Sequence, residues 1–371
     1  MSEAPAAAPT PLRREALLAF VLVVLGTLAR LRAAHAPFLT PDEALHLQIA
    51  GAPTLADVYR VSLGNAHPPL FMLLLHLWRK AAHGEWTLRL LSVMFGALAL
   101  PAAWFWTRRL LGRTAGLIAL ALFALLPSVV LVTSEVRGYA LLLATTASAL
   151  AALERGLDEG SAAALSAFGV FGVLALLSHY AAFRVMVAAA MYAAIRLFAQ
   201  PAARRLRTAA AASLAALAAV SLALLRTHVT RLHGSPLEAE VRATWLRESY
   251  LGAGEGAPAF LLRQTLSLFH YLFSATAPAL VAMALYLAAL VLIARRRPPA
   301  AALLLALPLA LAALGGLLGV YPYGGTRHSI DLVLCVGAGA AFGLARATGE
   351  RAWVAAATAA ALAPAAFLAA G

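Results

Sequence analysis

The stretch AAALLLALPLALAALGGLLG, residues 300–319, contains no charged residue and no histidine, and it is long enough to cross a lipid bilayer as a helix. Similar apolar stretches recur along the whole chain, which is 63% hydrophobic and 12% charged and has a mean hydropathy of +0.83. Soluble domains have a much more polar composition. The sequence therefore predicts an all-α, polytopic helical membrane protein.

About eleven transmembrane helices are expected from these stretches. They lie near residues 15–34, 86–107, 114–133, 138–153, 161–180, 182–199, 208–226, 277–294, 300–320, 329–346 and 352–370. The apolar part of residues 68–78 is too short to cross, so we expect short interfacial helices in this first outer loop. No separate soluble domain is expected.

Arginine clusters predict the orientation. With residues 68–78 left at the surface, the clusters fall on one side of the membrane, and the positive-inside rule makes that side the cytoplasm. They are Arg13-Arg14, Arg108–Arg113, Arg204–Arg207, Arg295–Arg297 and Arg346–Arg351. The net charge of +13 is explained by this topology, so no nucleic-acid partner is predicted. The single cysteine, Cys335, lies in an apolar stretch, which excludes an internal disulfide and a cysteine-based metal site.

Polar motifs collect on the opposite, non-cytoplasmic face. They are Thr40–His46, Asn65–Pro69, Glu135–Tyr139, Ser178–Tyr180 and Tyr321–Asp331. Several span interiors carry no charge and no histidine, whereas transporters usually place such groups near the membrane midplane. A polar site at one membrane surface instead suits an enzyme that acts on a lipid headgroup.

The motif Thr40-Pro41-Asp42-Glu43-Ala44-Leu45-His46 predicts a short surface helix. Thr40-x-x-Glu43 has the form of a capping box, and this local role competes with a role for Glu43 in the site. His46 follows Asp42 by four residues, so both lie on one helical face. His67, held extended before Pro68, either meets a phosphate, orients a carboxylate or lies as an interfacial histidine beside a turn.

Asp42-Glu43-Ala44, His67-Pro68-Pro69-Leu70, Gly84–Leu90 and Glu135–Tyr139 together resemble motifs of the GT-C glycosyltransferases. The nearest branch is the group of protein O-mannosyltransferases, aminoarabinose transferases and lipopolysaccharide-core galacturonosyltransferases. The resemblance implies a catalytic module over residues 1–200, with an outer loop at 35–85. It leaves residues 201–371 as a variable transmembrane region with an outer loop at 227–263 and an outer motif at 321–331.

The resemblance implies an inverting transferase that moves a hexosyl or pentosyl group from a polyprenyl phosphate to a hydroxyl or amine. The acceptor is a glycolipid, a glycan or a protein, and the location is a bacterial inner membrane with the site on its periplasmic side. Asp42 matches the family's acidic residue, which acts as the base or orients the acceptor.

The candidate residues fall into three groups. The catalytic group is Asp42, Glu43 and His46; the donor and phosphate group is His67, Arg137, Tyr139, Arg327 and His328; the possible pocket residues are Glu135, His179, Tyr180 and Tyr323. Gly324-Gly325 would let the backbone approach a phosphate. Alternatively, both arginines snorkel to headgroups, the tyrosines are interface aromatics and Glu135 neutralises Arg137. Arg89, at the outer start of a span, either lies near the site or snorkels.

No metal or other cofactor is predicted to be required, although Asp42, Glu43, His46 and His67 together have donors that suit a divalent cation. Three other functions stay open. One is a noncatalytic membrane scaffold, which would tolerate replacement of Asp42. An O-antigen ligase-like transferase would rely on Arg327 and His328, and a lipid or sugar transporter or flippase would need polar groups at depth. The outer loop at 227–263 either lies on the membrane surface, covers the site or receives the acceptor.

Overall fold

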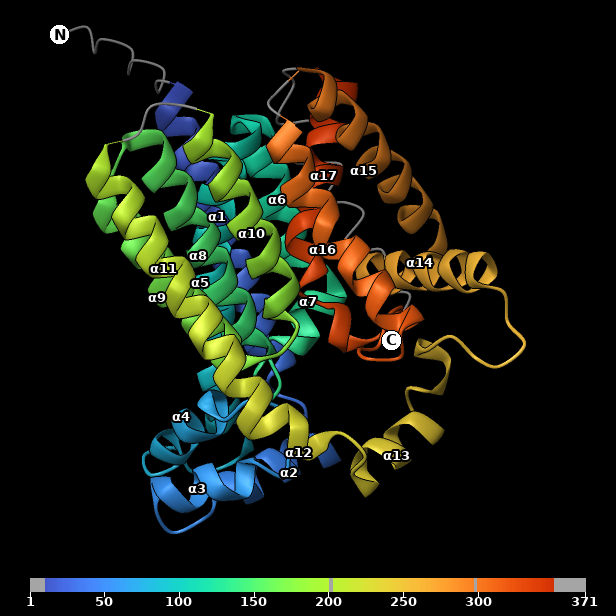
Figure 1. Cartoon of the computed structure of the whole chain (residues 1–371). Coiled ribbons are helices and arrows are strands. Elements are labelled where there is room, and N and C mark those ends of the chain that lie inside the picture. The colour runs from blue at the N-terminus through green and yellow to red at the C-terminus, as the bar shows by residue number, and fades with distance from the viewer. Residues whose placement is uncertain (1–10, 200–202, 297–298, 350–371) are drawn as a thin grey trace, which may run out of the picture.

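The computed structural model describes residues 11–199, 203–296 and 299–349, and within these residues every regular element is a helix. Long helices form a bundle, and a layer of short helices covers its lower end in the view of Figure 1. The all-α membrane class predicted from the sequence is thereby confirmed.

The bundle contains most of the predicted spans. Its helices are α1 (Pro11–Ala33), α5 (Glu85–Leu111), α6 (Arg113–Leu125), α8 (Tyr139–Glu159), α9 (Ala162–Ser178), α10 (Ala182–Phe198), α11 (Arg204–Leu224), α15 (Thr276–Arg296), α16 (Pro299–Leu317) and α17 (Leu332–Thr348). Among the described residues, six helices are long and apolar enough to cross a membrane, and α6, α9 and α17 are shorter apolar helices. The predicted span at 352–370 lies outside the described residues, so the total of eleven stays a prediction.

The predicted span at 114–133 is broken at a proline. Pro127 opens a separate short helix, α7 (Pro127–Val132), and Leu126 before it is extended, as residues before proline tend to be. Arg30 of α1 is buried at the break and binds the freed carbonyls of Phe123 and Ala124 at 2.9 and 3.1 Å. Its Nε also donates to Thr133 Oγ1, which fixes the start of the loop between α7 and α8.

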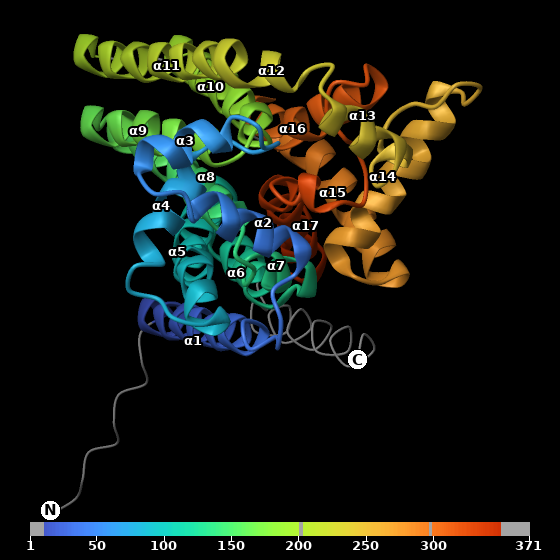
Figure 2. The same cartoon turned by 90° about the horizontal axis from the view of Figure 1, so that it is seen from below.

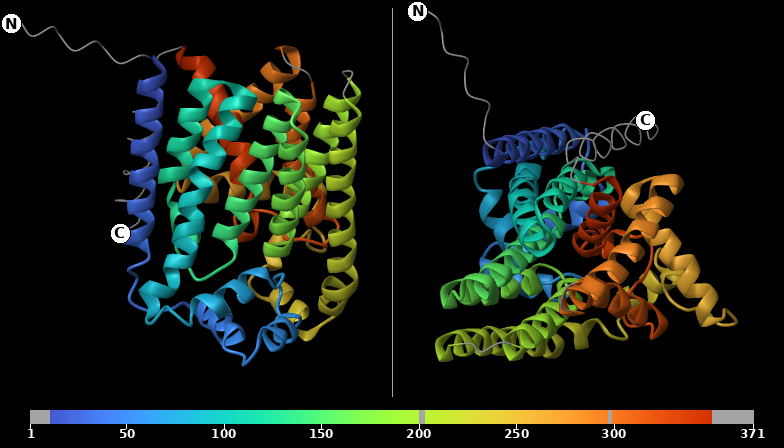
Figure 3. Two further views of the ribbon diagram at one scale, coloured as in Figure 1. Left: turned by 90° about the vertical axis from the view of Figure 1, so that its left-hand side faces the viewer. Right: turned by 90° about the horizontal axis from the view of Figure 1, so that it is seen from above.

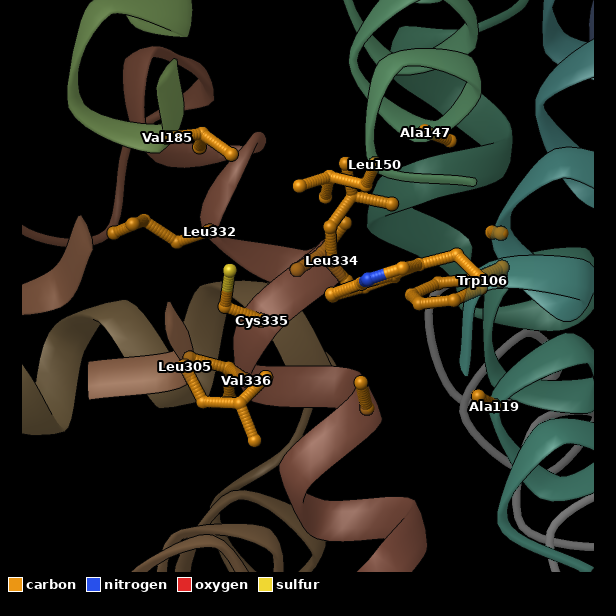
Figure 4. Packing of buried hydrophobic residues seen from close by; sticks show 14 of the residues in the cluster. Trp106, Ala119, Ala147, Leu150, Val185, Leu305, Leu332, Leu334, Cys335 and Val336 are labelled. Carbon is orange, nitrogen blue, oxygen red and sulfur yellow. The ribbon is translucent and has the colours of Figure 1, made fainter. Parts of the chain in front are cut away.

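The largest apolar core lies inside the bundle. Trp106 of α5, Leu150 of α8 and Leu334 of α17 meet there, as Figure 4 shows, and all three are nearly inaccessible to solvent. Cys335 is buried in the same core. On α17, Gly343 lies so close to the α15 backbone that a Cβ would overlap it. Small residues let membrane helices approach in this way.

The first outer loop forms three short helices: α2 (Pro41–Ala50), α3 (Leu55–Ser62) and α4 (Leu70–Trp78). The nine residues of α4 span about 14 Å, well short of a bilayer. It packs with α2 and α3 against the end of the bundle, so residues 68–78 lie in this layer, as the sequence predicts.

Residues 225–251 form a segment that we call the strap. The strap runs across the same end of the molecule as the first outer loop (Figure 2). It contains η1 (Leu225–Val229), α12 (Thr230–Leu232), α13 (Pro236–Ala243) and η2 (Arg247–Ser249), and α14 (Ala257–Phe273) follows it. Phe260 and Phe269 of α14 are buried inside the protein, so these two side chains do not lie on a membrane surface. Trp245 of the strap is exposed.

The basic turns lie at the end opposite this outer layer. The α5–α6 turn carries Arg108, Arg109 and Arg113, and the start of α11 and the end of α15 lie at the same level (Figure 3, left). Arg109 pairs with Asp158 and Glu159 there, and Arg108 pairs with Glu15 at 2.5 Å. This is the end of the bundle that the sequence assigns to the cytoplasm.

Candidate active site

The carboxylate of Asp42 binds two arginines through a single oxygen. Arg137 Nη1 lies 2.7 Å and Arg327 Nη2 lies 2.6 Å from Asp42 Oδ2. The three residues come from the start of α2, the loop before α8 and η3 (Arg327–Ser329). The fold thus joins segments that are almost 300 residues apart into one charged cluster. The Asp42 side chain is 23% exposed, so a ligand can reach it.

A capping box places Asp42 in the first turn of α2. Thr40 Oγ1 accepts from the Glu43 amide, and the Glu43 carboxylate accepts from the Thr40 amide at 2.9 Å. This part of the sequence prediction is confirmed. Proline at the first helical position and two acidic residues in the first turn add further reasons for the helix to begin there.

Glu43 itself is completely buried and does not line the cavity described below. Its oxygens accept from Arg89 Nε and Nη2 at 2.8 and 2.9 Å and from the Val136 amide at 2.8 Å. Burial alone would raise the pKa of Glu43, but the bonds from Arg89, Thr40 and Val136 hold that pKa below its usual value. Glu43 therefore supports the site structurally and does not contact the cavity. Arg89 is buried against Glu43, so the snorkelling interpretation of Arg89 is wrong.

Four histidines surround the cluster: His46, His67, His179 and His328. The ring centre of His67 lies 5.5, 4.9 and 6.1 Å from those of His46, His179 and His328. Burial lowers the pKa of His46 to about 4 and that of His328 to about 3, and it brings the pKa values of His67 and His179 well below the usual range. The four rings are consequently neutral at physiological pH.

Two of these histidines have an assigned tautomer. His46 Nδ1 lies 2.7 Å from the Asp42 carbonyl and therefore carries its proton. His179 Nδ1 accepts from the Ala181 amide at 3.1 Å, so the proton is on Nε2, which is buried without a partner. A buried donor without a partner costs free energy unless a ligand supplies the acceptor.

The turn that carries Arg327 and His328 is held by buried contacts. Arg184 of α10 forms an ion pair with Asp331, and its Nη2 donates to the His328 carbonyl at 2.8 Å. Gly324 has φ +126°, and a Cβ there would overlap Gln264 of α14. Gly325 donates to Ser267 Oγ of the same helix at 3.2 Å. The two glycines thus allow close packing against α14, whereas the sequence suggested approach to a phosphate.

A cavity of about 2180 Å³ joins the charged cluster to an apolar groove. Its polar end contains Asp42, His46, His67, Glu135, Arg137, His179, Tyr180, Arg327 and His328. Its apolar part lies between α10 and α11, where Met186, Val187, Leu214, Leu217 and Ala218 line it. The strap contributes a further wall, including Arg242, Trp245 and Tyr250. Of the three interpretations of the outer loop, covering the site is the one that these contacts match.

The structure brings together most of the predicted site residues. Tyr139 and Tyr323 lie behind the cavity wall: the Arg137 guanidinium lies 5.1 Å from the Tyr139 ring, and the Tyr323 hydroxyl lies 2.7 Å from Thr265 Oγ1. Glu135 lines the cavity and forms no ion pair with a described arginine, so it does not neutralise Arg137 by contact. Arg137 is buried, which excludes the snorkelling alternative for it.

One buried arginine that positions the site, Arg184, was missed as a site residue in the sequence. Arg184 follows a predicted outer turn at the start of a span, and a charged residue at that depth is a signal for a buried partner. Its partner Asp331 lies at the end of the predicted outer motif. The strap was unassigned because its polar, irregular sequence gives no periodic pattern.

No cluster of three or more His, Cys, Asp or Glu side chains with a geometry fit for a metal ion occurs in the part of the chain that the structure describes. Asp42, the natural anchor for a cation, already binds two arginines through Oδ2.

Comparison with known proteins agrees with this geometry. The model of the dolichyl-phosphate-mannose-protein mannosyltransferase family matches residues 66–227. A crystal structure of ArnT from Cupriavidus metallidurans bound to undecaprenyl phosphate superposes with a TM-score of 0.56 at 16% identity, over 91% of this chain and 61% of that chain. The chain has the GT-C glycosyltransferase fold. The predicted resemblance to the protein mannosyltransferase and ArnT-like branch is thus confirmed.

The fold of this chain also matches a second solved structure. The oligosaccharyltransferase AglB from Archaeoglobus fulgidus, in complex with an inhibitory peptide and a dolichol-phosphate, matches with a TM-score of 0.53 at 15% identity, over 94% of this chain and 55% of that chain. This chain therefore spans about three fifths of the ArnT chain and less of AglB. Comparison with curated protein sequences gave no significant match.

Proposed function

We propose that this protein is an inverting membrane glycosyltransferase that takes a sugar from a polyprenyl-phosphate carrier and transfers it to a hydroxyl or amine. The observation that carries the proposal is the Asp42–Arg137–Arg327 cluster at the polar end of a cavity whose other part is an apolar groove. The donor has the same two parts, an anionic phosphate and a long hydrocarbon tail. The solved ArnT and AglB structures are described with undecaprenyl phosphate and a dolichol-phosphate, respectively, which supports this class of ligand.

Arg137 and Arg327 are the phosphate-binding residues of this mechanism. Asp42 Oδ2 is an anionic oxygen bound by both guanidinium groups, so a phosphate oxygen finds matching donors at the same place. The phosphate gains negative charge as the sugar departs, and two fixed cations stabilise that charge most strongly in the transition state. His67 and His179 add neutral hydrogen-bonding groups beside them.

Asp42 is the base of the reaction. No described residue bonds its Oδ1, so this oxygen is available to accept the proton of the acceptor. The acceptor oxygen or nitrogen forms a bond to the anomeric carbon while the bond from that carbon to the phosphate oxygen breaks. The bonding electrons go to the phosphate, and the proton goes to Asp42. The products are a glycosylated acceptor and a free polyprenyl phosphate.

The same proposal places the site on the periplasmic face of a bacterial inner membrane. The cavity lies at the end of the bundle opposite the basic turns, and positive residues favour the cytoplasm. In this proposal the acceptor enters between the outer layer and the strap, whose exposed Trp245 lines the cavity.

Sugar transfer by the purified, lipid-reconstituted protein tests this function. The assay uses labelled polyprenyl-phosphate sugars and an extract of membrane lipids and envelope proteins as the acceptor source. Asp42→Asn should lower transfer by about 100-fold or more, because it removes the base. Asp57→Asn is the matched control, since Asp57 lies on α3 and pairs only with Arg60 and Thr54.

Arg327 and His328, on which a ligase-like transferase would rely, also line the cavity. That alternative predicts that Arg327→Ala loses transfer and that Asp42→Asn does not. Full transfer by Asp42→Asn together with loss in Arg327→Ala would replace the present proposal with the ligase-like one. Lipid movement between leaflets without any sugar transfer would favour a flippase.

A further inference from the structure

Glu135 is a carboxylate of the cavity that forms no ion pair with any described residue. It lies in the loop between α7 and α8, two residues before Arg137, and it lines the polar end of the cavity. Its Oε2 is buried and has no hydrogen-bond partner among the described residues. A buried carboxylate oxygen without a partner carries a desolvation cost that a bound hydroxyl or ammonium group would remove.

The other charged groups that line the cavity are matched once a donor is bound. Glu238 and Arg242 of the strap form an ion pair with each other, at 2.9 Å. Arg137 and Arg327 share Asp42. When a donor binds, its phosphodiester brings one negative charge, and the two arginines then balance the phosphodiester and Asp42. No described cavity cation remains to balance Glu135 or a further anion.

The histidines do not change this balance. Burial lowers the pKa of His46 to about 4 and that of His328 to about 3, and the rings of His67 and His179 are 4.9 Å apart beside Arg137. A proton on any of these rings would add a positive charge next to existing ones in a buried site. They therefore offer hydrogen bonds but no charge to a ligand.

We propose that Glu135 binds the sugar of the donor through the sugar's hydroxyl or amino groups, and that this sugar carries no carboxylate. The inference rests on the proposed function and adds the class of sugar to it. A uronic acid would bring its carboxylate beside an unbalanced Glu135, in a cavity whose arginines are occupied. An uncharged hexose or pentose, or an amino sugar, supplies the O–H or N–H donors that Oε2 lacks.

Donor binding by the reconstituted full-length protein tests the inference. Undecaprenyl phosphate carrying galactose, glucose or mannose is compared with the same carrier bearing the matching uronate, and with the sugar-free carrier. Within each pair the only change is oxidation of the C6 alcohol to a carboxylate. Wild type should bind the uronate of its preferred pair about 10-fold or more weakly than the hexose.

Glu135→Gln removes the charge and keeps the size of the side chain. The variant should reduce the discrimination against the uronate to about 3-fold or less, while its affinity for sugar-free undecaprenyl phosphate stays within about 2-fold of wild type. The second readout also shows that the variant is folded. Glu240→Gln, a change at an exposed carboxylate of α13 outside the cavity lining, is the control and should behave as wild type.

The outcomes separate this inference from the function on which it rests. A uronate bound as tightly as its hexose, or a discrimination that Glu135→Gln leaves unchanged, overturns the inference and leaves the transferase intact. Equal affinity for sugar-bearing and sugar-free carriers also overturns it, because Glu135 would then not contact the sugar. Failure to bind any carrier, with or without sugar, removes the proposed function itself.

Discussion

Arg89 of α5 and Glu43 of α2 form a buried ion pair in which two nitrogens of one side chain meet both oxygens of the other, at 2.8 and 2.9 Å. The same arginine donates to the Ala36 and Phe38 carbonyls, and the same glutamate accepts from the Val136 amide. One pair thus fixes the start of α2, which carries Asp42, and the loop that carries Arg137. The separation of Asp42 from Arg137 depends on it.

Breaking this pair should destabilise the protein strongly. Arg89→Ala leaves a carboxylate buried without its main partner, which typically costs about 3–5 kcal/mol. We expect a lower thermal midpoint in detergent and loss of sugar transfer. Arg60→Ala, which removes an exposed arginine of α3, is the control and should leave the midpoint almost unchanged. A thermal midpoint for Arg89→Ala equal to that of Arg60→Ala would show that the pair does not hold the outer layer.

Gly324 should tolerate no side chain. Alanine there must adopt φ +126° and would overlap Gln264, so the turn before Arg327 must shift. We expect Gly324→Ala to lower transfer by about 10-fold or more through misplacement of Arg327. Adding Gln264→Ala removes the overlap but keeps the backbone strain, so activity should recover only in part. Full activity of the single variant would mean that the turn does not position Arg327.

Stability should fall as the pH drops from 6.5 towards 4. The four site histidines have native pKa values far below 6.5, near which they titrate in the unfolded chain. Between these values the unfolded state binds more protons than the native state, so acid favours unfolding, by up to about 1.4 kcal/mol per pH unit for each histidine. Above pH 6.5 both states are neutral and the effect disappears.

Thermal midpoints at pH 7.5, 6.0 and 5.0 measure this dependence. Glu43, with a lowered pKa, loses its contribution only at more acidic pH, so the window above pH 5 belongs mainly to the histidines. His67→Asn should flatten the slope, whereas a change at the exposed His233 should not. The same slope in wild type and His67→Asn would mean that His67 is accessible to protons in the native state.

The sequence predicted those features that depend on local patterns. Apolar stretches predicted the bundle helices, and Thr40-x-x-Glu43 predicted the cap that the structure contains. Partners distant in the chain were not predictable, because nothing in a single sequence pairs Arg184 with Asp331 or Arg89 with Glu43. The same limit applies to Tyr139 and Tyr323, whose positions behind the cavity wall depend on packing against Arg137 and Thr265.

The groove between α10 and α11 should hold the donor tail. Leu217 of α11 is buried and lines the cavity. Its side chain packs against Gly172 of α9, where a Cβ would overlap it. Ala218 lines the same groove with a small side chain. Ala218→Trp places an indole in the path of a long hydrocarbon, while the charged cluster at Asp42 stays intact.

We therefore expect Ala218→Trp to raise the KM for long-chain polyprenyl donors by about 10-fold and to leave kcat nearly unchanged, because tail binding acts equally on ground and transition states. A soluble donor with a very short prenyl chain should react equally with wild type and variant, since it does not reach the groove. Ala211→Trp, on an exposed face of α11 outside the cavity lining, is the matched control. A similar rise in KM with both chain lengths would mean that the indole disturbs the phosphate end, and an unchanged KM with both would place the tail elsewhere.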